Sequence, residues 1–477
     1  MSPLASDPGH EEPPAPLREA SWIALERQEG ETLRSALERQ LRTAILSGAL
    51  RQGTRLPASR ALAAELGVSR GVVSDAYAQL EVQGFLGVRP RSAPVVAPVP
   101  RRDRVDRRAT REATAAPRHD LTPTTPDVAL FPLSRWLAAS QRVARKAETA
   151  ILEYREPAGE PALREALADH LGGTRGVVAE PGQIVIVQGT AQGVDLLLRV
   201  LRASGKSTLA VEDPSHPTQQ ERARSLGFQL RPRRVDEHGM VVDALDADAA
   251  LVTPAHQFPL GCVMTGERRR ELLAWSRATS GLVIEDDYDS EFRYDRQPAG
   301  ALQGLAPDHV VQLGTVSKTL APALRLGWIV APHNLAADLA AMKRLLDDFS
   351  PVLEQLTFTE FLASGRYYRH LRRARIVYHR RRDALHHALA RHLPAATVTG
   401  VAAGLHLVLR LPDRVDDMAI AADLDRAGIR VAPLSSFFVA APEQTGLVIG
   451  YGRLHESAAD RAVRTLGAVV RSRLANS

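Results

Sequence analysis

Apolar residues recur at helical spacing in three short stretches near the start of the chain. The pattern predicts one helix from Thr32 to Leu50, a second that Ser59 caps, and a third from about Arg70 to Gln83. The turn between the last two is Gly67-Val68-Ser69. Two short helices joined by a glycine-containing turn are typical of a helix-turn-helix. Two short strands follow, at residues 84–86 and 95–96, and would form a wing.

The pattern changes after Leu121, where helical stretches alternate with short runs that are apolar at every position. The runs lie at residues 183–187, 208–211, 250–253, 281–285, 309–313 and 327–330. The helical stretches between and before them lie at residues 134–152, 162–170, 192–202 and 266–279. This alternation predicts an α/β fold with a mostly parallel central sheet covered by helices on both faces. Ligands bind such sheets beyond the carboxyl ends of the strands.

Length and composition divide the chain further. A chain of 477 residues is too long for one ordinary domain. Residues 1–20 are rich in Pro, Ala and Glu and are expected to be disordered, and residues 98–119 have the Pro- and Arg-rich composition of a linker. We therefore expect one domain at 21–97 and a second, larger domain at 120–477.

Several classes of protein are excluded at this stage. No apolar run approaches the roughly 20 residues that span a bilayer, and the N-terminus lacks the basic start and apolar core of a secretory signal. We therefore expect a cytoplasmic protein without membrane contacts. Cys262 is the single cysteine, which excludes intrachain disulfides and cysteine-based zinc sites. No metal site is predicted.

Positive charge is concentrated in the first quarter of the chain. Residues 21–118 contain 17 Arg against ten acidic residues, whereas residues 1–20 carry a net charge of −3. This imbalance favours a polyanion as the partner of the helix-turn-helix region. The basic helix predicted at residues 367–382 could also touch DNA phosphates or serve only to join two lobes, and both interpretations stay open.

Lys318 is the leading candidate for covalent chemistry. It is one of four lysines in a chain that otherwise uses arginine, and it lies in the stretch Gly314-Thr-Val-Ser-Lys-Thr-Leu-Ala-Pro-Ala-Leu-Arg-Leu-Gly327. An amine can lose its proton and attack a carbonyl, which a guanidinium cannot do. On this stretch alone, an ordinary surface lysine is an equal alternative.

Polar side chains follow the predicted strands. Gln188-Gly-Thr-Ala191 leads into a helix start that offers backbone N–H groups to an anion. His216 and His256 lie in two further loops, and Asp286 and Tyr288 end a strand. An amine, a carboxylate, a phenol, imidazoles and an anion site together suit a phosphorylated aromatic aldehyde.

The first of two resemblances covers residues 21–97, which resemble the winged-helix domain of the GntR regulators. The motifs are G-T-R-L-P-A-S-R, L-G-V-S-R-G-V-V and Y-A-Q-L-E-V-Q-G-F-L. The resemblance implies binding to double-stranded operator DNA, with the second helix of the motif in the major groove. The residues it implies at the DNA are Arg55, Ser59, Arg60, Ser69, Arg70 and, at the wing, Arg91.

The second resemblance covers about residues 120–477, which look like a fold-type I aminotransferase. Its motifs include E-D-P-S-H-P, T-P-A-H-Q-F-P, I-E-D-D-Y-D-S-E-F-R-Y and G-T-V-S-K-T-L-A-P-A-L-R-L-G-W. The whole chain resembles the MocR subfamily of GntR regulators, and most closely its PdxR branch. This resemblance implies a homodimer and the cofactor pyridoxal 5′-phosphate.

The resemblance also implies a role for each site residue. Lys318 would form a Schiff base with the cofactor, Asp286 would pair with the ring nitrogen, and Tyr288 would bond the ring oxygen. His216 lies where many relatives stack a tyrosine on the cofactor ring. His256 is a further candidate at the cofactor, and a purely structural histidine is an equal alternative. Tyr154 would reach the phosphate of the neighbouring subunit. The residues implied to hold the phosphate are Gly189, Thr190, Ala191, Thr315, Ser317 and Arg325.

One departure from the family narrows the expected function. Aminotransferases usually hold the substrate carboxylate with an arginine near the C-terminus, where this chain has Val448, and Arg453 is a poor substitute. We therefore expect a regulator that senses pyridoxal 5′-phosphate itself and controls vitamin B6 synthesis genes. A regulator that senses an amine through the bound cofactor and a working aminotransferase with an attached DNA-binding domain are the alternatives.

Overall fold

The computed structural model describes residues 23, 25–87, 93–98, 117–294, 300–412 and 415–475. The chain divides into two compact units, at Met1–Thr114 and Ala115–Ser477. The segment 1–20, most of the predicted linker 98–119 and Arg91 lie outside the described residues. Among the described helices, none is both long enough and apolar enough to cross a bilayer.

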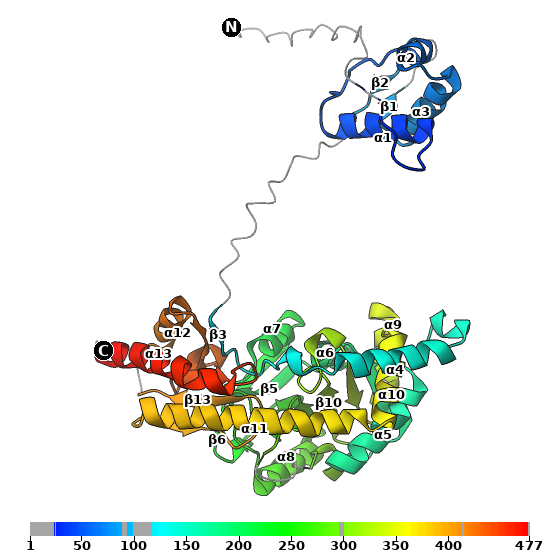
Figure 1. Cartoon of the computed structure of the whole chain (residues 1–477). Coiled ribbons are helices and arrows are strands. Elements are labelled where there is room, and N and C mark those ends of the chain that lie inside the picture. The colour runs from blue at the N-terminus through cyan, green and yellow to red at the C-terminus, as the bar shows by residue number, and fades with distance from the viewer. Residues whose placement is uncertain are drawn as a thin grey trace, which may run out of the picture. The chain divides into compact units, whose positions relative to one another are not determined.

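The first unit has the helix-turn-helix arrangement that the sequence predicts (Figure 1). Gly67 ends α2 at φ +65°, and the Ser69 hydroxyl accepts from the backbone N–H of Val72 at the start of α3. The prediction that Ser59 caps α2 is wrong, because the cap position is Ala58, which has no hydroxyl, and Ser59 is already helical. The elements are α1 (Leu33–Leu46), α2 (Ser59–Leu66), α3 (Arg70–Val82) and the antiparallel pair β1 (Leu86–Gly87) and β2 (Val95–Val96).

The second unit is built on an eight-stranded sheet with the strand order β4-β11-β10-β9-β8-β5-β6-β7. The pairs β10–β9, β9–β8, β8–β5 and β5–β6 are parallel, whereas β11 and β7 run antiparallel to their neighbours. The mostly parallel sheet is therefore confirmed. The strands are β4 (Ile184–Val187), β5 (Thr208–Asp213), β6 (Gln229–Asp236), β7 (Gly239–Met240), β8 (Ala249–Val252), β9 (Leu282–Asp287), β10 (Val310–Thr315) and β11 (Gly327–Val330).

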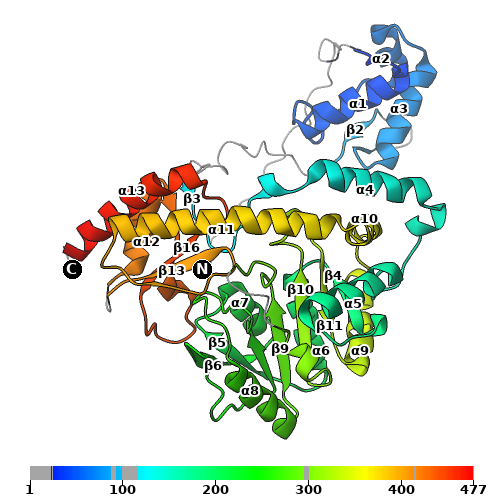
Figure 2. The ribbon, with the colours of Figure 1, turned by 60° about the horizontal axis from the view of Figure 1, so that its bottom comes forward.

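Helices cover both faces of this sheet, as Figure 2 shows. Alternate residues of β4 enter different cores: Ile184 and Ile186 pack in one, and Val185 and Val187 in the other. Burial on both faces is why these strands are apolar throughout. The helices around the sheet are α4 (Leu133–Lys146), α5 (Pro161–Arg175), α6 (Thr190–Ala203), α7 (Pro217–Ser225), α8 (Gly266–Thr279), α9 (His333–Asp347) and α10 (Val352–Ala363).

A smaller lobe follows in the chain. Its four-stranded sheet has the order β12-β13-β16-β15, and every pair in it is antiparallel. The long helix α11 (Arg366–His392) runs beside α13 (Glu456–Ala475), as both ribbon views show (Figures 1 and 2). The other elements are β12 (Val398–Thr399), β13 (His406–Arg410), α12 (Asp417–Arg426), β14 (Ile429–Arg430), β15 (Ala432–Pro433) and β16 (Gly446–Gly450).

Candidate functional site

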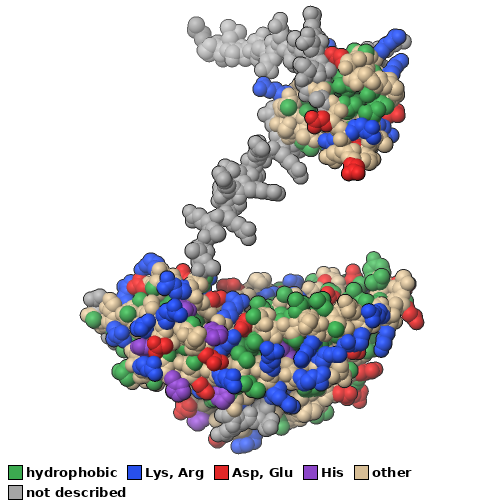
Figure 3. Space-filling model, viewed as in Figure 1, with side chains coloured by type: hydrophobic (Ala, Val, Ile, Leu, Met, Phe, Trp, Pro, Cys, Tyr) green, Lys and Arg blue, Asp and Glu red, His purple; other side chains and the backbone are tan. Residues whose placement is uncertain are grey.

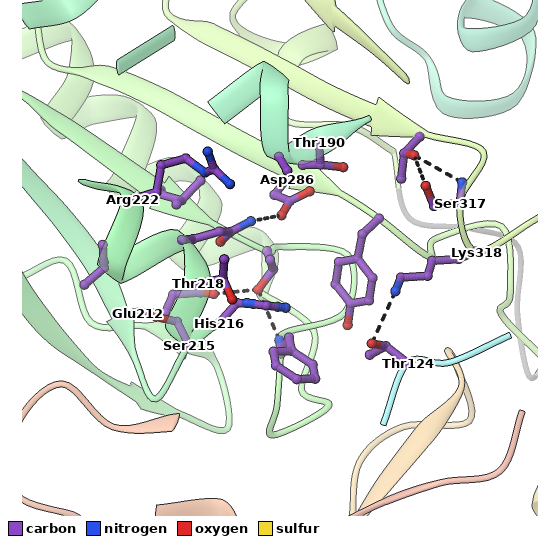
Figure 4. Close-up of a pocket in the computed structure, with 18 of the residues that line it drawn as sticks. Thr124, Thr190, Glu212, Ser215, His216, Thr218, Arg222, Asp286, Ser317 and Lys318 are labelled. Carbon is purple, nitrogen blue, oxygen red and sulfur yellow. Dashed lines mark hydrogen bonds between the residues drawn. The ribbon is translucent and has the colours of Figure 1, made fainter. Parts of the chain in front are cut away.

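A cavity of about 310 Å³ lies in the second unit, beyond the carboxyl ends of β5, β9 and β10. Its walls come from the start of α6, the end of β5, α7, the end of β9 and the loop after β10 (Figure 4). Parallel strands bring these loops to one edge of the sheet although they are far apart in the chain. The residues predicted from sequence that line it are Thr190, Ala191, His216, Asp286, Tyr288, Thr315, Ser317, Lys318 and Arg325.

Lys318 lies half-buried in the cavity, in the loop that follows β10. Burial lowers the pKa of its amine, and the carboxylates of Asp289 and Asp286 act in the opposite direction. A lowered pKa increases the fraction of neutral amine, which is the nucleophilic form. Nζ donates a hydrogen bond to Thr124 Oγ1 at 3.4 Å. The structure thus gives Lys318 the surroundings of a reactive amine.

Asp286 presents one carboxylate oxygen without a protein partner to this cavity. Its Oδ2 accepts from Gln219 Nε2 at 2.6 Å, whereas Oδ1 is buried and has no hydrogen-bond partner among the described residues. Burial raises the pKa of the carboxyl to about 7, against the opposing effect of the Gln219 bond. An unsatisfied buried carboxylate oxygen is costly, so the site is suited to a ligand that donates to Oδ1.

Tyr288 and His256 lie at different depths. The Tyr288 hydroxyl donates to the backbone carbonyl of His256 at 3.1 Å, and Tyr288 lines the cavity. His256 is outside the lining residues, and its Nδ1 lies 2.9 Å from Asp289 Oδ2. His256 is therefore a support behind the Tyr288 ring. His216 does line the cavity, with its ring centroid 5.6 Å from that of Phe258.

The anion cradle predicted from the sequence comes together around the N-terminus of α6. Gly189 precedes the helix at φ +86° and ψ 170°, a conformation that side chains disfavour. A Cβ on Gly189 would lie 3.2 Å from the Arg325 guanidinium, which donates to the carbonyl of Gln188. Thr315 Oγ1 and Ser317 Oγ are 2.9 Å apart beside them. Backbone N–H groups, hydroxyls and a guanidinium are natural partners of a phosphate.

Tyr154 does not reach the cavity of its own chain. Its side chain is 89% exposed and contacts Phe349 at a centroid distance of 6.1 Å. The contact of Tyr154 with a neighbouring subunit stays a prediction.

Several lining residues were missed by the sequence reasoning. Gln219 lies one helical turn after His216, so the E-D-P-S-H-P motif could have pointed to it. Glu212 is buried, lines the cavity and has its pKa raised to about 7 by burial. Thr124 precedes Lys318 by nearly two hundred residues, and no local pattern connects the two. Phe258 gives one wall an apolar surface.

Val448 stands at the position where aminotransferases usually have the substrate-binding arginine. Val448 is fully buried on β16, in an apolar cluster with Phe258, Val408, Leu434 and Phe437. Arg453 binds instead to the first residues of the second unit. It donates to Asp120 Oδ2 at 2.6 Å and to the carbonyl of Pro126 at 3.4 Å. The interpretation of Arg453 as a poor substitute thus has a structural reason.

The predicted DNA-contacting residues lie on the first unit. Ser69 and Arg70 are exposed at the start of α3, and Arg55 and Arg60 are exposed before and within α2. Ser59 is half-buried. The basic helix of the second unit is α11, along which basic side chains follow one another in Figure 3. Its exposed arginines include Arg369, Arg372, Arg373 and Arg380.

Two protein families match the chain. "Bacterial regulatory proteins, gntR family" matches residues 33–96, and "Aminotransferase class I and II" matches residues 124–465.

Relatives and solved structures agree with these matches. The chain is 35% identical to the HTH-type pyridoxine biosynthesis transcriptional regulator PdxR of Corynebacterium glutamicum, over 90% of this chain and 94% of that protein. It is 31% identical to the probable rhizopine catabolism regulatory protein MocR of Rhizobium meliloti, over 93% and 95% of the two chains. The crystal structure of an archaeal alanine:glyoxylate aminotransferase matches with a TM-score of 0.70 and 27% identity, covering 74% of this chain and 91% of that one.

Proposed function

The chain belongs to the MocR-type regulators of the gntR family, in which a DNA-binding helix-turn-helix domain is joined to an aminotransferase class I and II domain, and we propose that it senses pyridoxal 5′-phosphate and controls vitamin B6 synthesis genes. The aminotransferase-like fold implies binding of this cofactor. The domain boundaries we propose are 21–97 for DNA binding and 120–477 for the effector domain, with a linker between them.

Three features of the cavity match three chemical groups of pyridoxal 5′-phosphate. Pyridoxal 5′-phosphate would supply an aldehyde carbon, a ring nitrogen and a phosphate. Lys318 offers an amine with a lowered pKa to the aldehyde, and Asp286 offers Oδ1, which lacks a protein partner among the described residues, to a protonated ring nitrogen. The cradle at Gly189 and Arg325 suits the phosphate. The volume of about 310 Å³ lies in the range of small-molecule sites.

The remaining side chains orient the ligand and keep water out. Gln219 holds Asp286 through Oδ2, so that Oδ1 keeps a fixed direction. Tyr288 is held by the carbonyl of His256, and it lines the same cavity as Lys318. His216 and Phe258 supply flat and apolar surface. These groups are arranged to bind and position an aromatic ring.

One observation favours sensing over turnover, namely that Val448 stands where aminotransferases usually have the arginine that holds the substrate carboxylate. Val448 is buried in an apolar cluster with Phe258 and Phe437 and offers no charge to a carboxylate, while Arg453 is occupied by Asp120. Burying a carboxylate without a charged partner is strongly unfavourable. We therefore infer that the effector is the cofactor itself, with the alternative amine effector and transaminase activity as outcomes of the tests.

We also propose that the protein acts as a homodimer on paired DNA half-sites. Exposed apolar side chains gather on α4, on α9 and α10 and around Tyr154, and hydrophobic atoms are visible over α4 and α9 in Figure 3. A large exposed apolar surface is typical of an interface. These residues are Leu133, Leu137, Leu152, Tyr154, Leu345, Leu346 and Leu353. A dimer would also bring Tyr154 towards the partner's phosphate cradle.

The decisive experiment titrates pyridoxal 5′-phosphate into the full-length protein and follows the visible absorption of a lysine adduct. We expect a saturable band in the parent and in Lys206→Ala, a matched lysine removal outside the cavity. The band should be absent in Lys318→Ala. Its persistence in that variant would exclude Lys318 as the reacting amine.

The sensing step is tested by operator binding with and without the cofactor. We expect the affinity for DNA from a vitamin B6 synthesis gene to change on loading in the parent and to stay constant in Lys318→Ala. Equal affinities in the parent would contradict the sensing role. A spectral change on adding an amine such as GABA, or turnover of an amino acid with a keto acid, would favour one of the two alternatives.

A further inference from the structure

The effector unit begins with a segment that passes from the linker directly to the cavity. We name residues 117–127 the entrance segment. They are the first described residues after the DNA-binding unit, and they belong to the effector unit. A conformational change that the effector unit transmits to the linker through the covalent chain must therefore pass through this segment.

The first half of the entrance segment is fixed to the small lobe. Residues His119–Asp120 form a short strand, β3, that pairs in parallel with β14. Gly450 donates its backbone N–H to the carbonyl of Leu121 at 2.8 Å. The approach is so close that a Cβ on Gly450 would lie 2.2 Å from the oxygen of Thr122. The segment is therefore fixed to the small lobe from His119 as far as Thr122.

The second half is fixed by different groups. Arg381 of α11 contacts Asp127 Oδ2 at 2.8 Å, and Tyr378 accepts from the backbone N–H of Asp127 at 3.1 Å. A Cβ on Gly452 would lie 2.1 Å from the oxygen of Thr125. Arg453 bridges the two halves through Asp120 and Pro126. Two anchored halves thus leave Thr124 at the apex between them.

Thr124 has an unusual conformation, and its side chain makes one polar contact with the part of the chain that the structure describes, across the cavity. Its φ is +56°, a region that a β-branched residue rarely adopts and that signals strain or function. Its Oγ1 accepts from Lys318 Nζ at 3.4 Å, as the dashed line in Figure 4 marks. The side chain that faces the reactive amine therefore belongs to the segment that leads to the linker.

We propose that Thr124 is a latch: its hydrogen bond with Lys318 keeps the entrance segment in this conformation while Lys318 is a free amine. When Lys318 reacts, this restraint on the segment is removed. This inference rests on the proposed capture of an aldehyde. A free Nζ carries two or three hydrogens and can donate one to Thr124. Condensation forms a carbon–nitrogen double bond at Nζ, and two hydrogens leave with the aldehyde oxygen as water.

The consequence for Thr124 follows from geometry. After condensation the nitrogen keeps at most one hydrogen, and the plane of the double bond fixes its direction. Nζ can then no longer turn a hydrogen freely towards Thr124, so the contact that accompanies φ +56° is weakened and the apex can relax to an ordinary backbone conformation. The state of Lys318 thereby changes how firmly the entrance segment, which leads to the DNA-binding unit, is fixed to the effector unit.

The test is hydrogen exchange of the full-length protein, measured by mass spectrometry with and without pyridoxal 5′-phosphate. In the parent we expect exchange of the peptide covering residues 117–127 to rise at least threefold on loading. Thr124→Gly removes the hydroxyl and tolerates the positive φ, so its peptide should exchange rapidly in both states. Thr124→Ser keeps the hydroxyl and should respond as the parent does, as should Thr125→Ala, a neighbouring threonine removal.

The absorption band, recorded on the same samples, separates this inference from the proposed function. A band without any change of exchange in the parent overturns the latch alone, as does a parent-like response of Thr124→Gly. No band in the parent overturns the proposed capture and the latch with it. A response that follows the hydroxyl, present in Thr124→Ser and absent in Thr124→Gly, supports the latch.

Discussion

Gln219 Nε2 donates a hydrogen bond of 2.6 Å to Asp286 Oδ2 and leaves Asp286 Oδ1 without a partner among the described residues. The carboxyl is thereby held on one side and available on the other. A buried acid in this arrangement is placed to select a ligand that donates a proton-bearing nitrogen.

Replacing Gln219 should weaken cofactor binding in a pH-dependent way. Gln219→Leu removes the hydrogen bond that lowers the pKa of Asp286, so that pKa should rise further above about 7. A hydrogen bond to a charged group is worth about 1.5–3 kcal/mol, which corresponds to a tenfold or greater loss of affinity. Absorbance titrations should show a larger loss at pH 6.5 than at pH 8.5. Gln219→His retains a donor and should recover most of the affinity, and an equal loss at both pH values would contradict the role.

Asp286 should also make the unloaded protein less stable at higher pH. Its pKa is raised from 3.8 to about 7, so between these values the folded state binds the proton that the unfolded state has released. Stability then falls as pH rises through this window, by about 1.4 kcal/mol for each unit of pKa shift at most. Asp286→Asn removes the titration. Thermal unfolding of the unloaded protein should show the stability of the variant rising relative to that of the parent from pH 5 to pH 7, and parallel curves would contradict the buried carboxylate.

A side chain at Gly189 should disturb the anion cradle. Gly189→Ala places a Cβ 3.2 Å from the Arg325 guanidinium and strains a backbone at φ +86°. Gly205→Ala is a matched control, because Gly205 also has φ +86° but has no neighbour within 4 Å of a Cβ. Both variants should lose about 1–3 kcal/mol of stability through the backbone. Only Gly189→Ala should also lose affinity for inorganic phosphate and the cofactor, measured by calorimetry.

Replacing two arginines of the first unit should distinguish a contact with DNA bases from a contact with DNA phosphates. Arg70→Ala, at the exposed start of α3, should cost about 1–3 kcal/mol of operator affinity and relax discrimination at one base position. Arg55→Ala should weaken binding to all sequences alike and reduce the salt slope by about 1. Arg277→Ala, exposed on α8 of the effector unit, should bind as the parent does. Fluorescence anisotropy at several salt concentrations measures all three.

The proposed dimer is tested by charging its apolar surface. Leu137→Glu places a carboxylate on α4, among the exposed apolar residues, and should shift the protein towards monomer in sedimentation experiments. Leu305→Glu adds the same charge at another exposed leucine, outside that group, and should leave the assembly unchanged. A monomeric parent would contradict the dimer.

Much of the fold followed from the sequence because its signals are local. Strands buried on both faces are apolar throughout, and the turn of a helix-turn-helix often contains glycine, so both patterns can be recognised within a dozen residues. The loops at strand ends also follow from the α/β architecture, which is why Lys318, Asp286, Tyr288 and the cradle at Gly189 meet in one cavity.

Only the tertiary structure could assign the partners of these groups. His256 proved to lie behind Tyr288, Arg453 to hold Asp120, and Thr124 to reach Lys318 across almost two hundred residues. Such contacts depend on the direction of single side chains and on the packing of distant segments, and sequence spacing carries no record of either. The sequence therefore determined which residue types gather at the strand ends, and the fold decided which residues support them and which segment of the chain lies against Lys318.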